Sequence, residues 1–355
     1  MKHSCLSSTL GGKTLKLAFC SLLLVLLFSE KTRAQPGYVP TVAELEKQLQ
    51  PDLQKLAIQI ANNPKDALPY LERAKLYYML YERAVYKKSP ADFYSEKALA
   101  DASTAIKLNP TGEAYNVRAE FHRMFLYYDS TSRDMEPEQL VSFYLKNTDF
   151  DLARSDFLKA IRLGKDNDNL LTYFGNLSRL HSDRAQHLSN ASSELRARWG
   201  RYSLWDDFDV AAEYQKKVFE LGPKSVDNYP TDYDNRVAYV YDTKGNAAYR
   251  LGEYDIALDA FQQGDKYLNS RYFQIRPYYE RWGDTLIKKN LPAQAIEVFT
   301  KALNIPLCNC YDLFVRRGLL YEKMGNLQKA LDDYTAGLDK SAFAGLSGEL
   351  YIRRA

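Results

Sequence analysis

Three eight-residue segments decide the fold of this chain: ALDAFQQG at 257–264, AIEVFTKA at 295–302 and ALDDYTAG at 330–337. Each begins with alanine, has an aromatic residue four positions later and ends on a small residue three positions after that. Successive copies begin 38 and 35 residues apart, a length that fits a pair of short helices. Small residues at fixed helical positions mark close approach between two helices, and large aromatic residues fill the space beside them. The segments therefore predict a repeated helical hairpin.

A second pattern precedes each segment and completes the hairpin. Its three copies are Tyr241, Gly245 and Ala248; Tyr279, Gly283 and Leu286; and Phe314, Gly318 and Tyr321. The two halves together resemble the tetratricopeptide repeat, which has about 34 residues per unit. This resemblance implies an all-α, right-handed solenoid of helix-turn-helix units. One hairpin cannot bury its apolar stripe alone, so successive hairpins stack into one core with a concave inner surface.

The same template predicts three stretched, degenerate units upstream. Their second helices are indicated by Ala98, Ala102 and Ala105; by Ala153, Phe157 and Ala160; and by Ala211 and Val218, with Gln215 where an aromatic residue is expected. Two first helices begin Tyr70-x-x-Arg73-Ala74 and Tyr115-x-x-Arg118-Ala119, and the third is expected near 171–180. The units carry 12, 22 and 24 extra residues, in inserts at 81–94, 127–149 and 181–205. Such insertions usually fall on one face of an array, so a binding role, decoration and oligomer contact all stay open.

These patterns divide the chain into five parts. They are a signal peptide at 1–34, a linker and leader helix at 35–65, three degenerate units at 66–237, three regular units at 238–344, and the start of a further repeat helix at 345–355. Thr41 and Glu44 form a capping-box pattern at the start of the leader helix, and Asn63-Pro64 is expected to close it. Because Tyr351-x-x-Arg354-Ala355 restarts the repeat motif, the chain reads either as a truncated array or as one with an incomplete cap.

The first 34 residues have the pattern of a secretory signal. Lysines precede an apolar run at 17–28, which at 12 residues is short for a membrane span, and small residues lead up to Ala34. We expect cleavage near Ala34 and export to the periplasm or the extracellular space, with no transmembrane span in the mature chain. The alternative is an uncleaved N-terminal segment that anchors the chain in a membrane.

Charge gives no reason to expect nucleic acid as a partner. The signal segment holds five of the 48 Lys and Arg and one of the 45 Asp and Glu, which leaves 43 basic and 44 acidic residues. A chain with almost no net charge lacks the excess of positive charge that binds phosphate backbones.

Few residues in the remaining chain have a pattern that indicates chemistry. The three histidines after the signal, at 122, 181 and 187, lie in no ligand motif such as H-E-x-x-H. Cys308 and Cys310 can form a disulfide, supply two ligands to a soft metal, or serve as small residues in a turn. We therefore expect no enzyme, no cofactor and no metal site. The alternative is a carbohydrate-binding protein or a helical-toroid glycoside hydrolase, since sequence does not reveal carboxylate separations.

The family resemblance also names candidate contact residues. Tetratricopeptide domains typically hold extended or helical peptides against first-helix residues that face the concave surface. Matched position by position, the candidates are Tyr239, Asp242, Asn246, Tyr249 and Arg250; Glu280, Arg281, Asp284 and Lys288; and Asp312, Arg316, Leu319 and Lys323. Basic residues recur at equivalent positions, which favours a peptide with acidic groups held by charge-assisted hydrogen bonds. Solvated surface charge is the other interpretation. We expect a non-catalytic scaffold for an unidentified protein or peptide.

Overall fold

The chain folds as an all-α solenoid, as the repeated motifs predict. A computed structural model describes residues 40–86, 92–123, 139, 149–198, 204–222, 232–269, 272, 274–305 and 310–340. Within those ranges the regular secondary structure is helical and contains no strand. The predicted signal segment, most of the second insert and the predicted repeat start at 345–355 lie outside the described residues.

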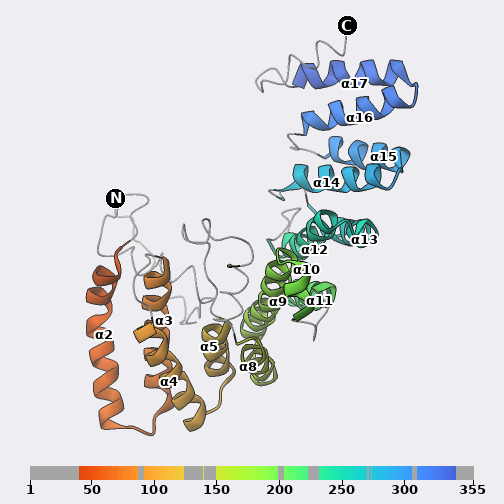
Figure 1. Cartoon of the computed structure of the whole chain (residues 1–355). Helices are drawn as coiled ribbons and strands as arrows, with labels where there is room; N and C mark the ends of the chain where they lie inside the picture. Colours follow the sequence, from red (N-terminus) through yellow and green to blue (C-terminus); the bar gives the residue numbers. More distant parts are fainter. Residues whose placement is uncertain are drawn as a thin grey trace, which may run out of the picture.

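Twelve of the helices form six consecutive antiparallel pairs, which we number as units one to six (Figure 1). Each unit has a first and a second helix. The pairs are α3 (Ala67–Tyr86) with α4 (Asp92–Leu108), α5 (Gly112–Arg123) with α8 (Phe150–Leu163), α9 (Asn167–Ser189) with α11 (Leu204–Leu221), α12 (Asp232–Leu251) with α13 (Tyr254–Asp265), α14 (Ile275–Lys288) with α15 (Pro292–Leu303), and α16 (Tyr311–Lys323) with α17 (Leu327–Lys340). Each second helix also packs on the first helix of the next unit, so one core runs along the array.

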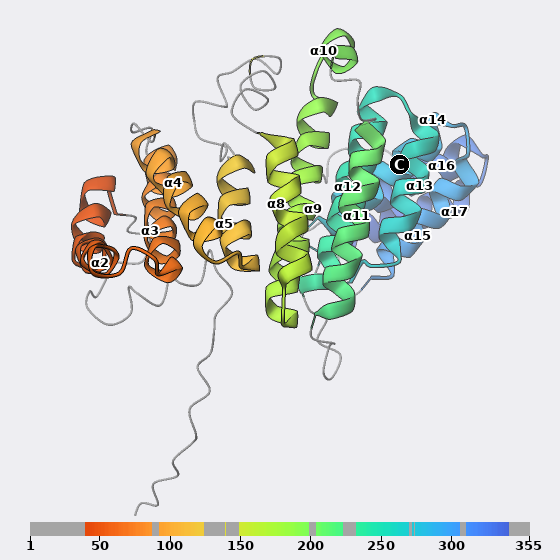
Figure 2. The same ribbon diagram turned by 90° about the horizontal axis from the view of Figure 1, so that it is seen from below.

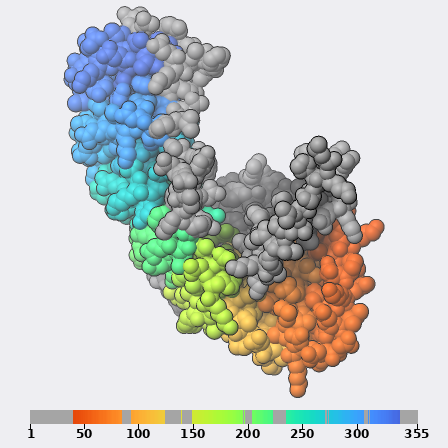
Figure 3. Space-filling model, turned by 180° about the vertical axis from the view of Figure 1, so that it is seen from behind, coloured from red at the N-terminus to blue at the C-terminus, as the bar shows by residue number. Residues whose placement is uncertain are grey.

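The molecule curves along its length. The first helices, such as α5 and α12, lie toward the inner side of the curve, and second helices such as α8 and α13 lie toward the outer side (Figure 1). Seen from below, the helices of the N-terminal half stand side by side in chain order (Figure 2). The space-filling view shows a hollow between the N-terminal and the C-terminal units (Figure 3). The curve therefore presents first-helix side chains on its concave side.

Close packing within each regular unit explains its glycine. A side chain at Gly245 would meet the ring of Phe261 at 2.7 Å, and one at Gly318 would meet the ring of Tyr334 at 2.5 Å. Gly283 faces Phe299 in the same way. The first helix of each regular unit thus lies directly on the aromatic residue of its second helix. The small and aromatic residues of the motif are packing residues, as predicted.

A buried ion pair joins the two helices in four of the six units. The arginine directly precedes the small residue of the first helix. The aspartate lies three residues after the first residue of the second-helix motif. The arginine donates two hydrogen bonds of 2.6 to 3.0 Å to this aspartate. The pairs are Arg73–Asp101, Arg118–Asp156, Arg184–Asp207 and Arg317–Asp333. In units one, two and six, an aromatic ring three positions before the arginine lies 5.7 to 5.9 Å from its guanidinium carbon. Two aligned contacts fix the register of one helix against the other.

Units four and five lack both the arginine and the aspartate of this pair. At the arginine position they have Lys244 and Trp282, and at the aspartate position they have Ala260 and Val298. Trp282 and Val298 belong to the largest hydrophobic cluster of the described core. The two positions therefore change together. Four units have the arginine–aspartate pair, and in the other two the second-helix residue is uncharged.

The predicted register of the third unit is wrong by seven residues. The motif Ala211, Gln215 and Val218 was expected for its second helix, but the pair Arg184–Asp207 aligns the unit on Leu204, Phe208 and Ala211. Ala185 and Phe208 share one buried cluster, as Ala119 and Phe157 of unit two do. Ala185 precedes Leu204 by 19 residues, against 12 between Gly318 and Ala330, so the unit carries seven extra residues rather than 24.

A leader helix precedes the array. α2 (Val42–Asn62) begins with the predicted capping box, in which the Thr41 amide donates to the Glu44 carboxylate and the Glu44 amide donates to the Thr41 hydroxyl. Asn63 caps its C-terminal end. The helix continues through Pro51 without interruption. A short helix, α10 (Ser193–Arg198), lies in the third insert. In the part of the chain that the structure describes, every helix is too short or too polar to cross a bilayer.

Candidate functional site

The predicted contact residues lie on the first helices of units four to six, on α12, α14 and α16. Their exposure differs widely. Tyr239 is 41% exposed, while Asp242 is 2% exposed on the same helix. Lys288 and Lys323 are exposed, and the remaining charged candidates of α14 and α16 are half-buried. The burial pattern separates residues that hold the units together from residues that face solvent.

Asp242 is a structural residue that joins units four and five. It accepts hydrogen bonds from Arg281 of α14 at 2.5 Å and from the hydroxyl of Tyr272 at 3.0 Å. Burial raises the pKa of its carboxyl, and the contacts with Arg281 and Tyr272 act in the opposite direction. Asp242 and Arg281 therefore form an ion pair across the joint between two units.

A row of charges joins units five and six in the same way. Arg276 of α14 lies 3.3 Å from Asp312 of α16, and Arg316 of α16 lies 2.6 Å from Asp284 of α14. Glu280, between the two pairs, lies 4.0 Å from Arg316. Burial first, and then the neighbouring Asp312, raise the pKa of Glu280 to about 7. The predicted acid-binding arginine at 316 thus already has carboxylate partners within the chain.

One further candidate contacts unit three. Arg250, at the end of α12, donates hydrogen bonds to the side chain of Asn190 at 2.7 Å and to that of Ser189 at 3.2 Å. Tyr249 is half-buried against the largest hydrophobic cluster and lies beside the ring of Tyr254 of its own unit. Arg250 therefore joins units three and four, while Tyr249 packs within the core of the regular units.

Six predicted residues have side chains with no hydrogen bond or ion pair within the described ranges. They are Tyr239, Asn246, Tyr249, Lys288, Leu319 and Lys323. Lys288 and Lys323 occupy equivalent positions at the ends of α14 and α16. Ile287, which sequence analysis missed, is 38% exposed directly before Lys288. Its position four residues after Gly283 is the one that Tyr249 holds in unit four, so the repeat alignment could have found it.

Sequence analysis also missed a buried polar group at the joint between units two and three. Arg123 of α5 lies 2.8 Å from Glu120 on its own helix and 3.2 Å from Asp183 of α9. Burial raises the pKa of Asp183 to about 6, against the effect of Arg123. Neighbouring first helices are thus joined by charged groups at several places along the inner side of the curve.

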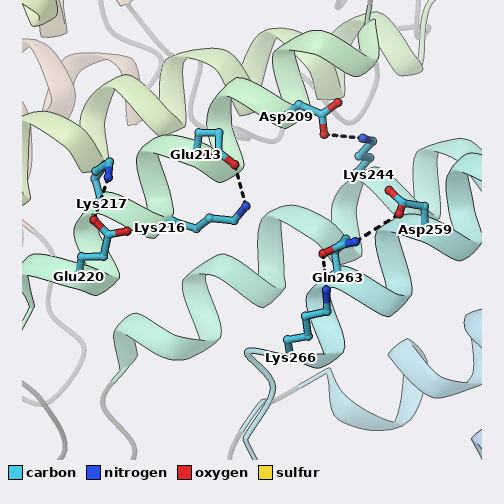
Figure 4. A network of polar contacts seen from close by, with 9 residues as sticks. All are labelled: Asp209, Glu213, Lys216, Lys217, Glu220, Lys244, Asp259, Gln263 and Lys266. Atoms are coloured by element: carbon cyan, nitrogen blue, oxygen red, sulfur yellow. Dashed lines mark hydrogen bonds and ion pairs between the residues drawn. The ribbon is translucent and has the colours of Figure 1, made fainter.

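Side chains at the joint between units three and four form a polar network (Figure 4). Lys244 of α12 lies 2.5 Å from Asp209 of α11, and Lys216 lies 2.7 Å from Glu213 one turn away on α11. Gln263 of α13 donates to Asp259 on its own helix. Lys216, Lys217 and Lys244 are paired there with carboxylates, and Lys266 donates to the neutral side chain of Gln263.

The histidines and the cysteine that the structure describes lie in packed or bonded positions. His181 is buried with its Nδ1 atom 2.8 Å from Asp207, and burial lowers the pKa of its ring. Cys310 is disulfide-bonded, while Cys308 lies outside the described residues, so their pairing stays a prediction. Within the described ranges, no three His, Cys, Asp or Glu side chains are placed to hold a metal ion.

No protein-family model and no curated protein matches the sequence. Solved structures do match. The C-terminal part of a repeat-containing protein from Cytophaga hutchinsonii is 12% identical, with 88% of this chain and 98% of that chain covered and a TM-score of 0.42. A tetratricopeptide repeat protein from Parabacteroides merdae is 14% identical over 88% of this chain and 98% of that chain, with a TM-score of 0.34. YrrB, a tetratricopeptide protein described as having an unusual peptide-binding site, is 15% identical over 84% and 98%, with a TM-score of 0.29.

These likenesses concern the fold. The six helical pairs, with a glycine of the first helix lying on an aromatic residue of the second helix in units four to six, form a helical-hairpin solenoid. The predicted all-α solenoid fold is thereby confirmed.

Proposed function

We propose that this chain is a non-catalytic scaffold that binds a protein or peptide on the concave face of its C-terminal units, outside the cytoplasm. One observation carries the proposal. Lys288 and Lys323 are exposed at equivalent positions of neighbouring first helices, next to the partly exposed apolar residues Ile287 and Leu319. A partner with acidic and apolar groups matches this combination, because exposed ammonium groups favour carboxylates and the apolar side chains add buried area.

The internal ion pairs reduce the set of candidate residues that could bind a partner. Arg281 and Arg316 bond carboxylates of the neighbouring unit, so they position α14 and α16 rather than bind a ligand. Reversing their charge would place like charges together at a joint and would disturb the fold as well as the binding. The two lysines have no such structural role in the described ranges, so they are the residues to change.

The test is affinity capture from a native envelope or secreted fraction with the chain from residue 35 to residue 355. The variant changes Lys288 and Lys323 to Glu. The matched control changes Lys107 and Lys165 to Glu, because these two lysines are also exposed but lie in the last turn of second helix α4 and just after second helix α8. Helix content and melting temperature are compared for all three proteins, so that a loss of fold is not read as a loss of binding.

We expect one protein to bind the unchanged chain and the control variant, and to be lost from the variant with Glu at 288 and 323. Retention of the same protein by all three forms would place the binding surface elsewhere. Equal loss from both variants would show a general effect of charge and would reject this face as the specific site.

A further inference from the structure

Glu280 holds an unusual place in the row of charges between units five and six. The row contains three carboxylates, on Glu280, Asp284 and Asp312, but only two guanidinium groups, on Arg276 and Arg316. Arg276 lies next to Asp312 and Arg316 is 2.6 Å from Asp284. Glu280 is left with a longer contact of 4.0 Å to Arg316, although its side chain is only 18% exposed.

Among the described residues, the positive groups that act on Glu280 are these two arginines. The groups that act on it are Asp312 and Arg316 from α16 and Arg276 from its own helix. On the side of α12, Arg281 is engaged by Asp242. At the end of α13, Asp265 accepts hydrogen bonds from Tyr279 of α14 and Lys301 of α15. Burial and the nearby Asp312 raise the pKa of Glu280 to about 7, so its charge changes in the neutral range.

We propose that a proton held between Glu280 and Asp312 latches α14 to α16, and that loss of this proton loosens the joint between units five and six. When Glu280 is protonated, its carboxyl donates a hydrogen bond to the carboxylate of Asp312. When it is ionised, two partly buried carboxylates repel each other across the joint. The joint also carries Lys288 and Lys323, one on each side. The latch follows from the charges alone and does not depend on the proposed binding role.

The sign of the pH effect follows from linkage. The pKa of Glu280 in the fold is above its ordinary value of 4.5, so the closed joint binds more protons than the open one between these values. Its contribution to stability is therefore fully present below about pH 4.5 and is lost as the pH rises through about 7. The joint should open more often at mildly alkaline pH than at mildly acidic pH.

Hydrogen exchange tests the latch at the helices concerned. Protection factors of the α16 amides, corrected for the intrinsic rate, are measured at about pH 5.5 and about pH 8, and we expect them to fall roughly tenfold. The variant Glu280→Gln keeps a hydrogen-bond donor but cannot ionise, so its α16 protection should not fall. If Glu280→Gln fails to fold, Glu280→Ala is used in its place, because it also removes the titrating group.

The control is Glu297→Gln, which removes a carboxylate from an exposed position on α15. This variant should show the same fall in α16 protection as the unchanged chain. An unchanged chain whose α16 protection is independent of pH contradicts the latch. A variant at position 280 that keeps the full fall contradicts it as well, because some other group would then carry the effect.

Discussion

A single glycine in each regular unit decides how closely its two helices approach. A methyl group at Gly283 would lie inside the contact distance of the Phe299 ring. We expect Gly283→Ala to lower the free energy of unfolding by about 1 to 3 kcal/mol, because overpacking outweighs the gain in helix propensity. Gly175→Ala is the matched control, since its nearest neighbour is Val218 at 4.0 Å, and it should stabilise the chain by about 0.5 to 1 kcal/mol. Urea unfolding measures both, and equal effects would contradict the packing argument.

A buried histidine sets an acid limit on the third unit. Burial lowers the pKa of His187 from its ordinary value of 6.5 to about 4. The unfolded chain therefore binds more protons between these values, so stability is lost as the pH falls from 6.5 toward 4. We expect the loss between about pH 7 and pH 4.5 to be smaller by about 2 kcal/mol in His187→Gln. The check is urea unfolding at both pH values, and parallel losses in the two proteins would rule out His187 as the cause.

At the scale of the element, the arginine–aspartate pair can be exchanged for an apolar one. Arg317→Leu leaves Asp333 buried without its guanidinium partner and should cost about 3 kcal/mol. The double variant Arg317→Leu with Asp333→Val should recover most of that loss, because unit five has Trp282 and Val298 at these positions. A double-mutant cycle in urea measures the coupling. Additive losses would show that the two positions do not depend on each other.

Helix positions could be predicted from the sequence in units whose motif residues are small and aromatic. They could be predicted less well in units that have other residues at these positions. In the third unit, Leu204 replaces the alanine and His181 replaces the aromatic residue, so the alignment moved to Ala211. The string Arg184-Ala185, which repeats Arg73-Ala74 and Arg118-Ala119, was a usable signal. It was missed because the arginine recurs as the partner of a buried aspartate, and the number of residues between the two changes with each insert.

The candidate site shows the same limit. Repeat position was enough to predict that Arg281 and Arg316 lie on the first-helix face. It was not enough to show that they bond Asp242 and Asp284 of the preceding unit, because such pairing depends on how two units are inclined to each other. Lys288 and Lys323 are exposed while Arg281 and Arg316 are half-buried, a difference that no motif encodes.

At the scale of the whole molecule, stability should be local. Each helix packs within its own unit or against the neighbouring one, so an array of this kind behaves as a chain of nearest-neighbour interfaces. A lesion in unit six should therefore weaken unit six strongly, unit five through its shared joint, and the N-terminal units hardly at all. A compact globular domain would instead transmit the loss to its entire core.

Hydrogen exchange of Arg317→Leu tests this expectation. We expect protection to fall by roughly tenfold or more in α16 and α17, to fall less in α14 and α15, and to stay unchanged in α3 to α8. The reason is that the variant breaks the pair with Asp333 inside unit six, and unit five is affected through the packing of α15 on α16 and the ion pairs between α14 and α16. A uniform fall from α3 to α17 would contradict it and would mean that the six units unfold as one.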